Sequence, residues 1–142
     1  MFTHLHVHSE YSPLDGMGKI EELVLRAKEL GQKAIAITDH GSMAGHFELE
    51  KICNKHGIKP IFGNEFYMSM GDEACKEDCN YHIIVLAKNK KGLENMYKLQ
   101  AKAYKENFYR KAHVNFNMLK EHSEGLIICS ACIGGVIGQL TL

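Results

Sequence analysis

Short apolar runs that alternate with segments of helical periodicity most constrain the fold of this 142-residue chain. The expected strands cover residues 3–9, 33–38, 60–68, 81–87 and 126–129. The expected helices cover residues 20–30, 43–55 and 91–108, followed by a helical turn at 115–121 and a last helix at 136–142. This order predicts βα units and an α/β fold with parallel strands, either as an open sheet or closed into a barrel.

Three histidines alternate with apolar residues in the first expected strand. His4, His6 and His8 are separated by Leu5 and Val7, and a strand turns alternate side chains to opposite faces. The three imidazoles would therefore share one face, where neighbours with Cα atoms about 6.6 Å apart can reach one ion. Imidazole binds zinc and several other first-row metals. The alternative is a half-exposed edge strand with a solvated histidine face.

The composition is that of one ordinary globular domain, with 45% hydrophobic and 24% charged residues. Lysine plus arginine and aspartate plus glutamate both number 17, so no overall basic field attracts nucleic acid. Nine histidines indicate metal or acid–base chemistry. The five cysteines are an odd number, and no signal peptide precedes the first strand, which favours a cytoplasmic location.

Metal-capable side chains stand at or near the ends of several expected strands, where ligands gather in parallel α/β folds. These residues are His8, Asp15, His40, Glu65 and Cys132. Imidazoles, carboxylates and a thiolate suit zinc, manganese or iron, and adjacent ions in such a set support phosphoester hydrolysis. Glu65 or Asp15 could bridge two ions, while Asp39 would orient an imidazole as a supporting residue.

Four short motifs resemble those of the polymerase-and-histidinol-phosphatase (PHP) superfamily. They are His6-Val7-His8, Asp15-Gly16, Thr38-Asp39-His40-Gly41 and Gly63-Asn64-Glu65. Three longer stretches, residues 4–12, 81–89 and 124–132, are similar to the N-terminal PHP domains of bacterial replicative DNA polymerases. The resemblance covers nearly the whole chain. Its set of motifs is specific, although each motif alone is weak.

The resemblance implies a distorted (β/α) barrel with a site for two or three divalent ions, zinc or else manganese or iron. The residues at the metal-binding positions of the family are His6, His8, Asp15, His40, Glu65, His82 and Cys132. His8, Asp15 and His40 would be catalytic. We expect His6, His8 and Glu65 to share one ion, with His40 and Cys132 near a neighbouring ion. His82 fits least well, because it stands at the start of an expected strand.

The same resemblance implies a function in DNA replication. The intact parent would be a DNA-directed DNA polymerase, a nucleotidyltransferase that works with DNA and replisome subunits. Its PHP part would be a metal-dependent phosphoesterase of the 3'-5' exonuclease type. Two alternatives are a stand-alone phosphatase of the histidinol-phosphatase kind and a non-catalytic metal-binding scaffold.

One part of the family pattern is missing from the sequence. The pattern closes with an Asp-x-His motif on a late strand, and no aspartate follows Asp78. Residues 1–142 are therefore expected to form the N-terminal part of a PHP domain, truncated before the last barrel strands and without the polymerase domains. We expect such a fragment to be inactive as a phosphodiesterase and to self-associate through open strand edges.

Several other residues are expected to have structural roles only. Three histidines are interpreted as surface residues: His46, His113 and His122. Cys75 and Cys79 are interpreted as loop thiols rather than half of a zinc knuckle, because no second pair lies nearby. Helical spacing predicts that Phe47 faces the core.

Overall fold

The computed structural model of the chain describes residues 2–71 and 80–141. It contains two compact units, residues 1–64 and residues 65–142. Strand β2, Lys59–Met68, contributes residues 59–64 to the first unit and residues 65–68 to the second. Cys75 and Cys79 lie outside the described residues. Within the described ranges, none of the helices combines the length and the apolar character needed to cross a membrane.

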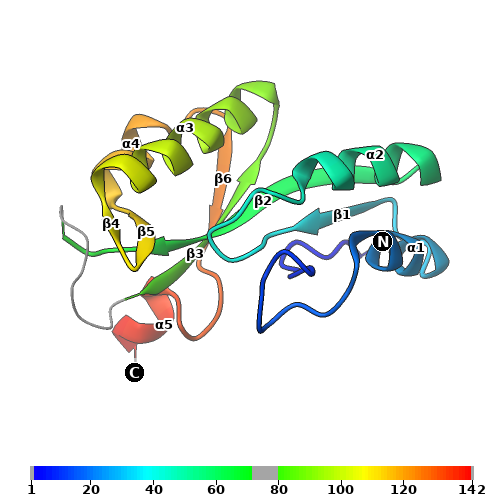
Figure 1. Cartoon of the computed structure of the whole chain (residues 1–142), viewed down its shortest axis with the longest axis horizontal. Helices are drawn as coiled ribbons and strands as arrows, with labels where there is room; N and C mark the ends of the chain where they lie inside the picture. Colours follow the sequence, from blue (N-terminus) through cyan, green and yellow to red (C-terminus); the bar gives the residue numbers. More distant parts are fainter. Residues whose placement is uncertain (1, 72–79, 142) are drawn as a thin grey trace. The chain divides into compact units, whose positions relative to one another are not determined.

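The first unit packs two helices beside a short pair of parallel strands (Figure 1). Helix α1, Ile20–Glu29, and helix α2, His46–His56, contact each other. Strand β1, Ala34–Ile37, pairs in parallel with the first residues of β2. The buried core of this unit contains Ile20, Val24, Ala27, Ile35, Ile37, Leu49, Ile52, Cys53 and Ile58. The core residues that belong to α1 and α2 recur at helical spacing, which explains why both helices were predictable.

The histidine-rich segment is extended but is not a regular strand, so that prediction was wrong. The backbone N–H of Ala36 donates to the carbonyl of His4 at 3.0 Å, and that of Thr38 donates to the carbonyl of Val7 at 2.8 Å. Between these two hydrogen bonds the N-terminal segment advances three residues, from His4 to Val7, whereas the segment that it pairs with advances only two, from Ala36 to Thr38. This difference breaks the strand register and the alternation of side chains between the two faces. Leu5 is consequently exposed, whereas Val7 packs against the core.

The second unit has a mixed sheet, which corrects the expectation that all strands run parallel. Its described strands follow the order β4-β5-β2-β3-β6. They comprise β3, Tyr81–Ala87; β4, Phe108–Tyr109; β5, Lys111–Val114; and β6, Leu126–Cys129. Strand β5 is parallel to β2, but β6 is antiparallel to β3 and β4 is antiparallel to β5. The fold class is therefore mixed α/β, and the closed barrel stays a prediction.

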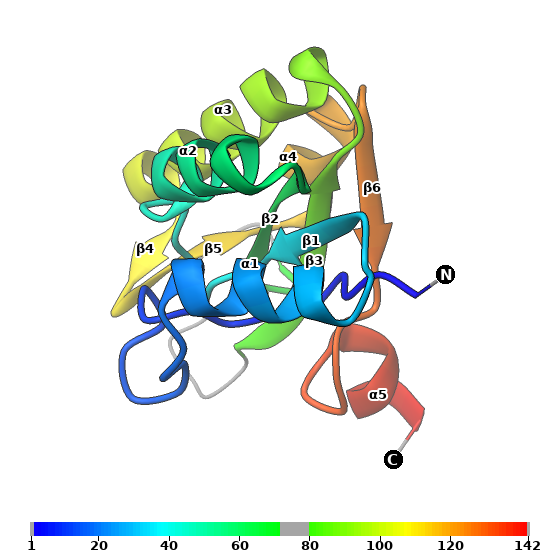
Figure 2. The same ribbon diagram turned by 90° about the vertical axis from the view of Figure 1, so that its right-hand side faces the viewer.

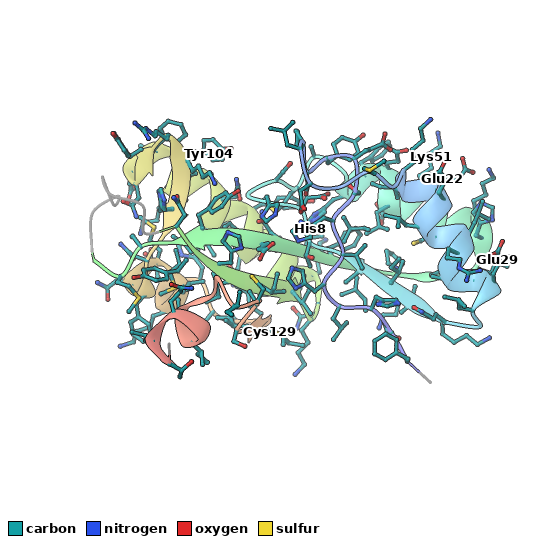
Figure 3. All side chains as sticks on the ribbon, turned by 90° about the horizontal axis from the view of Figure 1, so that it is seen from below. His8, Glu22, Glu29, Lys51, Tyr104 and Cys129 are labelled. Atoms are coloured by element: carbon teal, nitrogen blue, oxygen red, sulfur yellow. The ribbon has the colours of Figure 1, made fainter. Side chains whose placement is uncertain are left out.

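Three helices are described in the second unit. Helix α3, Lys90–Glu106, packs against β3 and β5, with the Asn89 side chain accepting a hydrogen bond from the Gly92 N–H at its start. Helix α4 spans Phe116–Glu121 and helix α5 spans Val136–Thr141. Figure 2 shows α5 beyond the end of β6 and away from α3. The labelled Tyr104 projects from the outer face of α3 (Figure 3).

Two histidines that we expected at the surface are buried. His46 is 4% exposed, and its Nε2 lies 2.9 Å from the carbonyl oxygen of Gly63. His113 is 2% exposed, and its Nε2 lies 2.8 Å from the side-chain oxygen of Asn80. His113 belongs to β5, a strand that the sequence did not predict. Desolvation by burial is the largest effect on both imidazoles and lowers the pKa of each.

These two pKa shifts predict that the chain loses stability in mild acid. Because the folded-state pKa of His46 and of His113 is lowered, the unfolded chain takes up protons first as the pH falls through about 6.5. The free energy of unfolding should therefore decrease from pH 7.5 to pH 5. Urea unfolding followed by circular dichroism, with a chelator present, measures this. The double variant His46→Gln, His113→Gln should show a flatter profile, and an unchanged decline would contradict the assignment.

Candidate metal centre

The first unit brings together three of the predicted ligands, from three different segments. His8 lies on the extended N-terminal segment (Figure 3), Asp15 on the following loop and His40 just after β1. The Asp15 carboxylate oxygen Oδ2 lies 2.5 Å from His8 Nδ1 and 3.1 Å from His40 Nε2. One ligand atom from each residue lies within 4.8 Å of the other two. An ion with bonds of about 2.1 Å in tetrahedral geometry holds its ligand atoms about 3.4 Å apart. His40 Nε2 lies close to this distance from Asp15 Oδ2, whereas His8 Nδ1 lies at hydrogen-bond distance and would move outward to admit the ion.

His6 extends this group on the other side of His8. The Nε2 atoms of His6 and His8 are 3.0 Å apart. At this distance the two imidazoles either share a proton in a hydrogen bond or direct their lone pairs toward one cation. His4, the third alternating histidine, instead packs its ring against Phe2, with centroids 4.7 Å apart.

The charge state of Asp15 suits cation binding. Its side chain is 55% exposed. Partial desolvation is the largest single effect and favours the protonated form, but the charge and hydrogen bond of His8, together with His40, outweigh it. The net result is a lowered pKa for the Asp15 carboxyl. Asp15 is therefore ionised throughout the neutral range.

Asp39 makes hydrogen bonds beside this group that the sequence did not reveal. Its buried carboxylate accepts hydrogen bonds from the backbone N–H of Ser9 at 2.7 Å, the Ser9 hydroxyl at 2.8 Å and the Ser12 hydroxyl at 2.7 Å. We expected Asp39 to orient an imidazole directly, but its described hydrogen bonds go to these two serines. Sequence reasoning missed Ser9 and Ser12, because a serine in a loop gives no signal of burial.

The second unit assembles another set of predicted ligands. Glu65 lies within β2 and is 1% exposed, and its Oε1 is 2.9 Å from His82 Nδ1. Cys132 Sγ lies 3.8 Å from the same nitrogen. A carboxylate, an imidazole and a thiol form a donor set that zinc accepts well.

The antiparallel pairing of β3 and β6 explains why His82 lies beside Glu65 and Cys132. The start of one strand lies beside the end of its antiparallel partner, so His82 at the start of β3 faces the turn after β6. The backbone N–H of His82 donates to Gly134 at 3.0 Å, and that of Gly135 donates to Cys132 at 2.8 Å. The doubt about His82 arose from assuming that every strand was parallel.

Comparisons with known proteins place this sequence in a family and among solved folds. The family model described as PHP domain matches residues 4–142. The sequence is 44% identical to DNA polymerase III subunit alpha of Treponema pallidum over 99% of this chain, and 45% identical to that of Helicobacter pylori over 96%. The chain spans only 12% and 11% of the length of these two curated relatives.

The fold is similar to that of solved proteins. A protein of Bifidobacterium adolescentis, described as a candidate metal-dependent phosphoesterase, matches with a TM-score of 0.52 and 25% identity, over 71% of this chain and 32% of that one. An amidohydrolase of Chromobacterium violaceum, solved with sulfate and no metal, matches with a TM-score of 0.50 and 25% identity, over 69% of this chain and 34% of that one. With the family model matching all but the first three residues, this chain belongs to the PHP domain family.

Proposed function

We propose that this chain serves as the N-terminal PHP domain of a bacterial DNA polymerase III alpha subunit and binds divalent metal ions, with zinc preferred. The proposed ligands are His6, His8, Asp15, His40, Glu65, His82 and Cys132. The high identity to alpha subunits along nearly the whole chain supports the parentage. The polymerase activity, and contacts with DNA and replisome subunits, would then belong to the intact protein.

The observation that carries the metal proposal is the group formed by His8, Asp15 and His40. Three side chains from separate segments converge on the Asp15 carboxylate. Imidazoles and an ionised carboxylate are first-row metal ligands. The sharing of one ion by His6, His8 and Glu65 stays a prediction.

The residues of the first unit suit phosphoester chemistry. A bound divalent ion would supply hydroxide near neutral pH and positive charge for a phosphate oxygen. Asp15 stays ionised and compensates the charge of that ion. His8 and His40 orient the carboxylate, and the exposure of Asp15 leaves the group open to a phosphodiester from solvent. The proposed reaction class is metal-dependent phosphoester hydrolysis, of the exonuclease type in the intact protein.

Metal binding and hydrolysis together test this proposal. We expect the purified chain, dialysed against zinc or manganese, to retain at least one ion per molecule by plasma mass spectrometry. Asp15→Asn should lower that content, because a neutral amide is a much weaker ligand. A chain that retains no metal after dialysis would overturn the proposal.

The alternatives differ in what the intact protein hydrolyses. Cleavage of a single-stranded oligonucleotide, lost in Asp15→Asn, would support the exonuclease type. Hydrolysis of histidinol phosphate alone would favour the stand-alone phosphatase. Bound metal with neither activity would favour the non-catalytic scaffold.

A further inference from the structure

Asp39 is a buried carboxylate in the first unit, 2% exposed, and burial of such a group requires hydrogen-bond donors. Its described donors are the Ser9 backbone N–H and the hydroxyls of Ser9 and Ser12, at 2.7 to 2.8 Å. Both serines are themselves buried. The carboxylate therefore fixes the backbone at Ser9 and the side chain of Ser12 in one place.

Each of these bonds reaches a proposed metal ligand through the backbone. Ser9 directly follows His8. The Ser12 carbonyl accepts from the N–H of Asp15 at 3.1 Å, and the Ser12 hydroxyl accepts from the N–H of His40 at 3.1 Å. The Ser12 hydroxyl thus joins the loop that carries Asp15 to the backbone of His40 while it donates to Asp39.

The loop of residues 9–18 is also held by close contacts between its own backbone atoms. The Glu10 N–H donates to the Gly18 carbonyl at 3.0 Å. A Cβ atom at Gly16 would lie 1.9 Å from the Ser9 carbonyl oxygen, so only glycine allows this approach. Without the fixed ends at Ser9 and Ser12, a loop with Gly16 and Gly18 would have many conformations.

We propose that Ser9, Ser12 and Asp39 are positioning residues that hold His8, Asp15 and His40 in the metal-binding arrangement before an ion binds. This inference rests on the proposed function. Removal of a residue that orients a metal ligand typically lowers metal affinity 10- to 100-fold. Here the partners act on the backbone that carries the ligands, so the arrangement depends on two serine hydroxyls and one buried carboxylate.

The test compares Ser12→Ala with Ser123→Ala, a matched substitution in the second unit, where the Ser123 hydroxyl donates to the Lys120 carbonyl at an exposed position. Zinc affinity is measured by competition with a chromophoric chelator, well below the melting temperature of each variant. We expect Ser12→Ala to bind zinc about 10- to 100-fold more weakly and Ser123→Ala to bind as the wild type does. A lower melting temperature with unchanged affinity would show that Ser12 is merely structural, and would overturn the inference.

Metal-free nitrogen-15 NMR separates this inference from the proposed function. In Ser12→Ala, the backbone amides of Asp15 and His40 should shift or broaden without any metal, and those of the second unit should not. If the wild type binds no zinc but these signals move, the proposed function fails and the positioning role stands. If the wild type binds zinc and the signals stay in place, the positioning role fails alone. Should Ser12→Ala not fold, Ser9→Ala, which keeps the Ser9 N–H and Ser12 bonds to Asp39, provides the same comparison with a smaller expected effect.

Discussion

Replacement of His8 by alanine is expected to weaken zinc binding about 100-fold. His8 stands at the middle of the first-unit group, with Nδ1 2.5 Å from the Asp15 carboxylate and Nε2 3.0 Å from His6 Nε2. Zinc bound by four ligands gains about 10–16 kcal/mol, hence roughly 3 kcal/mol for each ligand. A loss of that size corresponds to about two orders of magnitude in affinity.

His4→Ala is the matched control, because His4 lies on the same extended segment and its ring packs against Phe2. We expect zinc affinity close to that of the wild type for His4→Ala, measured with the same competing chelator at pH 7.5. Equal affinity losses in the two variants would mean that the segment binds zinc without the geometry described here. No loss in either would remove His8 from the ligand set.

Much of the fold could be predicted because its elements carry local signals. Strands β3 and β6 were predicted with their observed bounds, since each contains a continuous apolar run. Helix α2 ends where Gly57 adopts a φ of 71°, as its sequence indicates. Strand β4 has only two residues, and β5, with the sequence Lys-Ala-His-Val, has no continuous apolar run. The direction of a strand is also set by its tertiary pairing, so the hydrophobic pattern of the sequence could not predict that β3 and β6 are antiparallel.

In the candidate site, too, local sequence predicted some residues, whereas others depend on tertiary contacts. His8, Asp15 and His40 could be proposed because metal ligands belong to few residue types and their motifs resemble a known family. The contact of His82 with Glu65 and Cys132 depends on strand direction, and the roles of Ser9 and Ser12 depend on which loop residues become buried. Both facts arise only after the chain has folded.

Phe66→Ala should cost the second unit about 3–5 kcal/mol of its free energy of unfolding. Phe66 is 1% exposed and lies near the C-terminal end of β2. Its neighbours Glu65 and Tyr67 both contact His82, so Phe66 points to the opposite face of the strand. The substitution leaves a cavity that close-packed neighbours fill only in part. A loss of this size is a large share of the 5–15 kcal/mol that typical domains possess.

Phe47→Ala makes the matched control, because Phe47 is 78% exposed on α2, contrary to its predicted inward position. The substitution removes an exposed ring and introduces alanine, the best helix former. It should therefore change the free energy of unfolding by no more than about 0.5 kcal/mol. Urea unfolding of both variants, followed by circular dichroism, makes the comparison. The Phe66 variant should unfold at a lower urea concentration than the Phe47 variant. Loss of the packing contacts of the Phe66 ring should also loosen β2 around Glu65. Similar midpoints for the two variants would contradict the burial of Phe66 and the strand geometry that places Glu65 beside His82.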